Sequence, residues 1–171
     1  MKNKKIISSL IIALSITTLT ACTKDNKLPN DPIAENVQET NTTKSSTKII
    51  GRKEFINRLQ NIQKELDALP DKKDSDAGVT NAMKNYYGLG YEMYDKELNE
   101  IYAVLKKSLP PEEMEKLRTE QLKWIAMKED KANKEAEKYK GGTFEFVALY
   151  ISLYESTKER SYELVNEYMM D

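Results

Sequence analysis

The sequence of 171 residues contains no histidine and a single cysteine, Cys22. Without histidine, the chain lacks the side chain best suited to acid–base catalysis near neutral pH and the commonest metal ligand. Ser-His and Cys-His nucleophilic pairs are excluded, and so are zinc sites built on His and Cys. One cysteine cannot form a disulfide within the chain, so packing alone must stabilise the fold. Carboxylate chemistry stays open, but no motif predicts a catalytic residue, a metal site or a cofactor.

The N-terminus has the pattern of a secretory signal. Three lysines within residues 1–5 precede an uncharged run of about sixteen residues, which is short for a membrane-spanning helix of about 20 residues. The run ends in Leu-Thr-Ala before Cys22, an order that resembles the lipobox of bacterial lipoproteins, whose cysteine receives a diacylglycerol. The resemblance implies a signal peptide over residues 1–21 and a protein held by lipid on Cys22 at the outer side of the cell membrane. The alternatives are an ordinary cleaved signal peptide with a chance cysteine and a retained transmembrane anchor.

The rest of the chain divides into a polar segment and one domain. Residues 22–50 are rich in Asn, Thr, Lys, Asp and Pro, which predicts a disordered linker behind the acylated cysteine. Residues 51–171 are long enough for one ordinary domain. This domain has 20 Lys and Arg against 24 Asp and Glu, a net charge of −4, and shows no basic patch for nucleic acid.

Apolar residues at alternating spacings of three and four predict helices over about 52–69, 80–109, 111–140 and 143–168. The polar run after Pro70 is expected to end the first helix, Gly141 to cap the third in a left-handed conformation, and Thr143 to begin the fourth. Gly88 and Gly90 inside the second helix predict either a kink or a close helix–helix approach. No segment shows sustained strand alternation. The sequence therefore predicts an all-α fold, a small antiparallel bundle of about four helices.

Polar residues interrupt the apolar faces of three of these helices. They are Asp95, Asn99 and Tyr102 beside Leu98, then Gln121, Trp124 and Lys128, then Thr157 and Arg160. Because polar groups on a packed face need hydrogen-bond partners, one interpretation is an internal network, for example with Asp95 facing Arg160. The alternatives are a partner-binding surface and a carboxylate pair in a ligand pocket.

The same residues resemble a known family. The stretches DKELNEIY, LRTEQLKWIAMKED, GGT and TKERSYEL occur in the order and approximate spacing of the lysozyme inhibitor LprI-like N-terminal domain, over about residues 83–164. The resemblance places the family motif, which we interpret as mainly structural, at Asp95, Leu98, Asn99, Tyr102, Gln121, Trp124, Lys128, Gly141, Gly142, Thr157, Arg160 and Leu164.

The sequence departs from the family pattern in two places. Lys128-Glu129 stands where members usually have Arg-Asp, which keeps the charges but loses the bidentate fork of arginine. Members also commonly carry cysteines flanking the Gly-Gly turn, where this chain offers Ala132 and, further on, Ser152 or Leu153. Packing must then replace a stabilisation of about 2–4 kcal/mol. The aromatic residues expected to do so are Phe144, Phe146, Tyr150 and Tyr154.

The resemblance implies a protein outside the cytoplasm that binds and inhibits lysozyme or a related wall hydrolase and is not itself an enzyme. One alternative is an interaction module that binds another surface protein or the cell wall, with an exposed aromatic patch around Tyr86, Tyr87 and Tyr91. Another is an enzyme that cleaves wall glycan with two carboxyl groups about 5–9.5 Å apart in a cleft.

Overall fold

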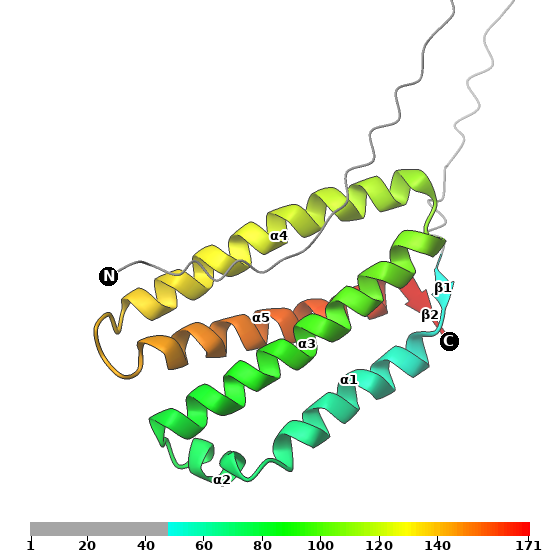
Figure 1. Ribbon diagram of the computed structural model, residues 1–171. Helices are drawn as coiled ribbons and strands as arrows, with labels where there is room; N and C mark the ends of the chain where they lie inside the picture. The colour runs from blue at the N-terminus through cyan, green and yellow to red at the C-terminus, as the bar shows by residue number, and fades with distance from the viewer. Residues whose placement is uncertain (1–47) are drawn as a thin grey trace, which may run out of the picture. The chain divides into compact units, whose positions relative to one another are not determined.

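The computed structural model describes residues 48–171, so the predicted signal peptide, Cys22 and the predicted linker up to residue 47 lie outside the described residues. The described part consists almost entirely of helices, which confirms the all-α prediction (Figure 1). Its elements are β1 (Ile49–Ile50), α1 (Arg52–Asp67), α2 (Asp71–Asp76), α3 (Thr80–Ser108), α4 (Pro111–Glu137), α5 (Glu145–Tyr168) and β2 (Met169–Met170).

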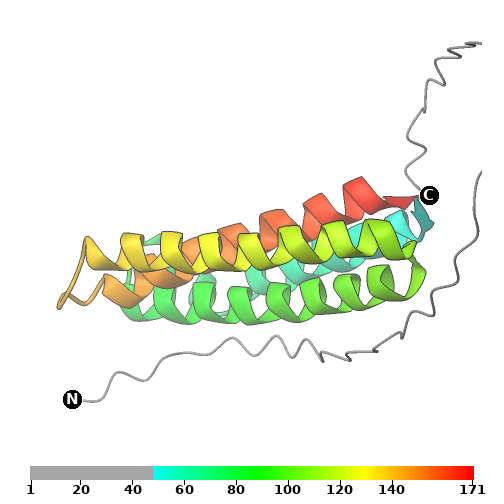
Figure 2. The same ribbon diagram turned by 90° about the horizontal axis from the view of Figure 1, so that it is seen from above.

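The four long helices α1, α3, α4 and α5 form an antiparallel bundle (Figures 1 and 2). Helix α5 packs against α3, α4 and α1, whereas α3 and α4 bring few of their Cα atoms within 8 Å of each other. Helix α5 is therefore the central element, and α4 depends on α5 and on long side chains to hold its place beside α3.

The described residues contain five helices, one more than expected, because the polar run after Pro70 forms the short helix α2. Pro70 stands at its N-cap, Asp71 and Asp74 lie in its first turn, and Ser75 is buried. Proline is tolerated at a helix start and acidic residues are favourable there, so a sequence that stops α1 also begins α2. Helix α2 packs against α3.

The turn between α4 and α5 differs in detail from the expectation. Gly141 has φ of +75°, so it is left-handed as predicted, but it lies beyond the end of α4 at Glu137. Helix α5 begins at Glu145 and its N-cap is Phe144, with no side-chain cap hydrogen bond, so the prediction that Thr143 caps it was wrong. The Glu145 carboxylate reaches back instead and accepts a hydrogen bond of 2.8 Å from the Gly141 amide.

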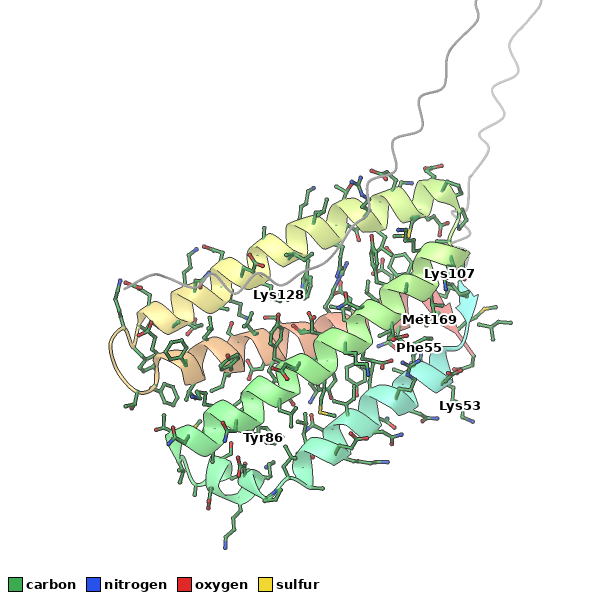
Figure 3. The ribbon with its side chains drawn as sticks, in the orientation of Figure 1. Lys53, Phe55, Tyr86, Lys107, Lys128 and Met169 are labelled. Atoms are coloured by element: carbon green, nitrogen blue, oxygen red, sulfur yellow. The ribbon has the colours of Figure 1, made fainter. Side chains whose placement is uncertain are left out.

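A two-residue parallel pairing joins the two ends of the described chain. Ile49 pairs with Met169 and Ile50 with Met170, and the Gly51 amide donates to the Met170 carbonyl at 3.0 Å. Phe55 and Met169 lie close to this end of the bundle (Figure 3). Residues 49–50, which the sequence analysis placed in the linker, therefore form β1, and strands this short leave no alternation for a sequence pattern to detect.

The core follows the predicted stripes only in part. The apolar spacing in the sequence places Tyr87, Tyr91, Tyr94, Leu98 and Leu105 on one stripe of helix α3. Tyr94, Leu98 and Leu105 are buried, but nearer the N-terminus of α3 the buried residues are Tyr86 and Gly90, whereas Tyr87 and Tyr91 are half-buried. Helix α3 packs against α5 on one side and against α1 and α2 on the other, so a second stripe of its surface is covered. When a helix packs against several neighbours, its buried residues do not all lie on one stripe with a spacing of 3.6 residues.

The four aromatic residues expected to replace the missing disulfide do not form one cluster. Phe144 packs against Tyr139 with ring centroids 4.8 Å apart, and Phe146 is exposed. Tyr154 joins another group, with its ring centroid 5.6 Å from that of Tyr87 and 5.7 Å from that of Tyr94. The stabilising contacts of Tyr154 therefore connect α5 to α3 rather than to the α4–α5 turn.

Gly90 marks a close helix–helix approach and not a break, because α3 runs without interruption from Thr80 to Ser108. A Cβ atom on Gly90 would lie 2.7 Å from Tyr154 Cδ2 and 3.3 Å from Leu66 Cδ1. A Cβ atom on Gly88 would lie 3.8 Å from the Tyr150 ring, an ordinary van der Waals contact. Of these two positions in α3, only position 90 therefore requires a glycine for the helices to pack this closely.

We expect Gly90→Ala to lower the free energy of unfolding by about 2 kcal/mol, because overpacking against the enclosed Tyr154 ring outweighs the gain in helix propensity. Gly88→Ala is the matched control and should raise that free energy by up to about 1 kcal/mol. Urea unfolding followed by circular dichroism measures both. Equal effects of the two substitutions would contradict the assignment of the close approach to Gly90.

Candidate functional site

The family-motif residues fall into two clusters and a turn. Asp95 and Tyr102 of α3 lie with Trp124 and Lys128 of α4 along the α3–α4 side, where the two backbones are far apart. Gln121 of α4 meets Arg160 of α5 inside the bundle. Gly141 and Gly142 lie in the α4–α5 turn. The motif therefore contributes mainly to the placement of α4.

Lys128 is an almost completely buried cation. Its side chain is 2% exposed, and its Nζ lies 3.8 Å from the Asp95 carboxylate, 4.8 Å from the centre of the Trp124 ring and 5.1 Å from that of Tyr91. Figure 3 shows Lys128 between α4 and α3. Burial lowers the pKa of the Lys128 ammonium, and the Asp95 charge opposes part of that change. Ring faces and a carboxylate thus replace water around the charge.

Asp95 connects this buried cation to the surface. Its side chain is 30% exposed, and Asn99 Nδ2 donates to Asp95 Oδ2 at 3.3 Å. The expectation that Asp95 faces Arg160 was wrong, because Asp95 lies on the side of α3 toward α4 whereas the Arg160 guanidinium reaches Gln121 and Glu120 of α4. Leu98 beside it is buried and Tyr102 is half-buried.

Arg160 is the centre of the second cluster. Its Nε donates to Gln121 Oε1 at 3.0 Å, and its Nη1 lies 2.9 Å from the Glu163 carboxylate. Thr157 and Leu164, one turn away on either side, are fully buried. The arrangement sets the register of α4 on α5, because Gln121 and Arg160 meet only when the two helices are aligned.

Sequence reasoning did not single out two further polar contacts. Glu97 is buried on α3 and pairs with Arg58 of α1 at 2.9 Å, and burial raises the pKa of its carboxyl. Gln63 of α1 accepts hydrogen bonds from the Tyr154 hydroxyl at 2.7 Å and from Lys158 Nζ at 2.6 Å. In the sequence, Glu97 and Gln63 stand next to apolar residues, which indicates that they are partly buried. This pattern does not identify the residue on another helix that each of them contacts.

A shallow hollow of about 500 Å³ lies along α3 and includes Asp95, Asn99 and Glu100 in its lining. All seven lining residues belong to α3, so among the described residues the hollow has one wall and is a helix face, not a cleft. Within residues 48–171, no group of three or more acidic side chains is placed to hold a metal ion. In the same part of the chain, no helix has the length and apolar character needed to cross a bilayer.

We expect Asp95→Asn to lower the free energy of unfolding by about 2 kcal/mol, because Lys128 keeps its charge and loses its counter-ion. This value lies between those for exposed and for fully buried ion pairs. Lys128→Met removes the buried charge, keeps the apolar stem and should be nearly neutral. The double variant should recover most of the loss. Urea unfolding of the four proteins measures this coupling, and a zero coupling energy would contradict the pairing.

The pH dependence provides a second readout for the same variant. Because the pKa of Lys128 is lower in the folded chain than in the unfolded chain, the unfolded chain binds more protons between the two values, and stability rises with pH there. Loss of the Asp95 charge lowers the folded pKa of Lys128 further, so Asp95→Asn should regain part of its lost stability as the pH rises toward 10.5, the ordinary pKa of a lysine.

The comparisons with known proteins agree with the motif. No curated protein and no solved structure matches the chain. A sequence model of the family described as "Lysozyme inhibitor LprI" matches residues 71–164, from the start of α2 to the last turns of α5. This range is more than half of the chain and contains both clusters and the α4–α5 turn. The chain belongs to the lysozyme inhibitor LprI family.

Proposed function

We propose that the protein is a lipid-anchored inhibitor of lysozyme or a related wall hydrolase, and that it acts outside the cytoplasm. The observation that carries this proposal is the family match over residues 71–164. The match includes the cluster around Lys128, the cluster around Arg160 and the turn at Gly141, so it extends over most of the described fold.

The proposed anchor is the lipid on Cys22, which follows the signal-like run and the Leu-Thr-Ala sequence. Two acyl chains hold a protein at a bilayer far better than one, since each buried methylene contributes about 0.8 kcal/mol. A flexible linker from Cys22 to β1 at Ile49 would give the bundle a range of about 30 Å from the membrane. This range would let the domain meet a soluble hydrolase in the wall.

The contacts of the acidic residue in the family motif and the net charge of the domain support binding rather than catalysis. Asp95, the acidic residue of the motif, is occupied by Lys128 and Asn99, and the hollow beside it has one wall. Glycosidases need two free carboxyl groups on opposite sides of a bound sugar. The net charge of −4 over residues 51–171 would instead favour encounter with a basic partner, and lysozymes are usually basic.

The alternative of a general interaction module depended on an exposed aromatic patch around Tyr86, Tyr87 and Tyr91. Tyr86 is buried against Tyr87, with ring centroids 5.2 Å apart, and Tyr87 and Tyr91 are half-buried. Their burial assigns these rings to the packing of α3, so this patch does not favour the alternative.

The inhibitor proposal predicts that a molar excess of the purified protein slows the lysis of a cell-wall suspension by lysozyme. Turbidity over time measures the effect, with lysozymes of several types and with heat-unfolded protein as the control. Undiminished lysis with every type would refute the proposal.

The anchor proposal predicts that cells given a clickable palmitate analogue label the wild-type protein and not Cys22→Ser. The variant should keep the thermal unfolding of the wild type, because the core is built from residues 48–171. A label that persists in Cys22→Ser would show that the lipid is attached elsewhere.

A further inference from the structure

The connection between α4 and α5 together with the first two residues of α5, residues 138–146, is here called the distal turn. It lies at one end of the bundle, and β1 and β2 lie at the other end (Figure 1). Two of its aromatic side chains are uncovered, because Tyr139 is 45% exposed and Phe146 is 54% exposed. Two exposed aromatic side chains at one end of the bundle suit a contact with a partner, since aromatic residues are enriched in binding hot spots.

Hydrogen bonds and a ring contact connect residues within the distal turn. The Gly142 amide donates to the Tyr139 carbonyl at 2.9 Å, and the Gly141 amide donates to the Glu145 carboxylate at 2.8 Å. The Tyr139 ring also packs on Phe144. A loop that is ordered before binding loses little conformational entropy when it binds, which is how rigid aromatic loops reach high affinity.

Two lysines flank Tyr139, and each forms an exposed ion pair with a glutamate of α4. Lys138 lies 2.6 Å from Glu135 and Lys140 lies 2.6 Å from Glu137, and all four side chains are exposed. The hydrogen bond from Lys140 to Glu137 raises the pKa of the Lys140 ammonium, which keeps it charged. Exposed ion pairs of this kind are worth at most about 1 kcal/mol, so a carboxylate of a partner can exchange with Glu137.

We propose that the distal turn inserts into the glycan-binding cleft of the inhibited lysozyme, an inference that rests on the function proposed above. The turn lies at one end of the bundle and carries exposed aromatic side chains, and substrate clefts are concave and lined with apolar and aromatic groups. The cleft also contains two carboxyl groups that act on the sugar, and Lys140 supplies the complementary charge. Tyr139 and Phe146 contact the cleft walls, while Lys140 exchanges Glu137 for a cleft carboxylate.

The other exposed apolar side chains do not combine these properties. Leu89 lies within α3, Leu122 and Met127 lie within α4, and Val79 is an aliphatic residue at the N-cap of α3. Ile50 and Met170 lie together on β1 and β2, at the end where the linker enters. Both side chains are aliphatic, so this end offers no exposed aromatic ring.

The test compares the acylated wild-type chain in detergent with Tyr139→Ser/Phe146→Ser, with Lys140→Ala and with the control Leu122→Ser/Met127→Ser. The control removes an equal number of exposed apolar side chains from α4, outside the distal turn. Binding to a c-type lysozyme is measured by calorimetry and inhibition by wall lysis. A second arm adds a chitin trisaccharide that fills the cleft.

We expect the aromatic double variant to bind at least about 30-fold more weakly, the change that hot-spot residues give. Lys140→Ala should bind several-fold more weakly with a smaller dependence on salt, the control should bind like the wild type, and the trisaccharide should compete. Wild-type inhibition that persists in the aromatic variant, or that ignores the trisaccharide, overturns this inference and leaves the proposed function standing. Absence of inhibition by the wild type overturns both.

Discussion

The ring of Tyr154 lies against the backbone of Gly90, and the arrangement of three helices depends on this contact. The approach of α5 to α3 is so close that a single methyl group at position 90 would meet the ring. From this position the Tyr154 hydroxyl reaches Gln63 of α1, and the ring packs on Tyr94 of α3. One side chain therefore connects α1, α3 and α5. In a chain that cannot form an internal disulfide, such packing is the main source of stability.

Helix α4 is held by a different kind of interaction. Its backbone stays away from α3, and the space between them contains the Lys128 ammonium with its aromatic and acidic neighbours. On the α5 side, Gln121 and Arg160 form a buried hydrogen bond. Buried polar pairs repay their desolvation only in one geometry, so we interpret them as specifying the orientation of α4 rather than as adding stability. The family motif therefore describes how α4 and its turn are placed.

The two ends of the bundle differ in a way that fits an anchored inhibitor. The parallel pairing of β1 with β2 holds the entry of the chain at one end. The distal turn, with its exposed aromatic rings and exchangeable lysine partners, lies at the other end. Lys128 lies on α4 and Arg160 on α5, the two helices that the distal turn joins, so contacts far from that turn still set its direction.

The sequence by itself determined the helical fold, the extent of the long helices and the family, because periodic apolar spacing and ordered motifs are local properties of the chain. It also located the left-handed Gly141 and limited the meaning of Gly90 to two possibilities. The tertiary structure alone decided which possibility holds, that Asp95 pairs with Lys128 and not with Arg160, and that residues 49–50 pair with the C-terminus. These outcomes depend on distances between segments far apart in the chain, and the periodicity of one helix contains no information about the side chains that its neighbours present.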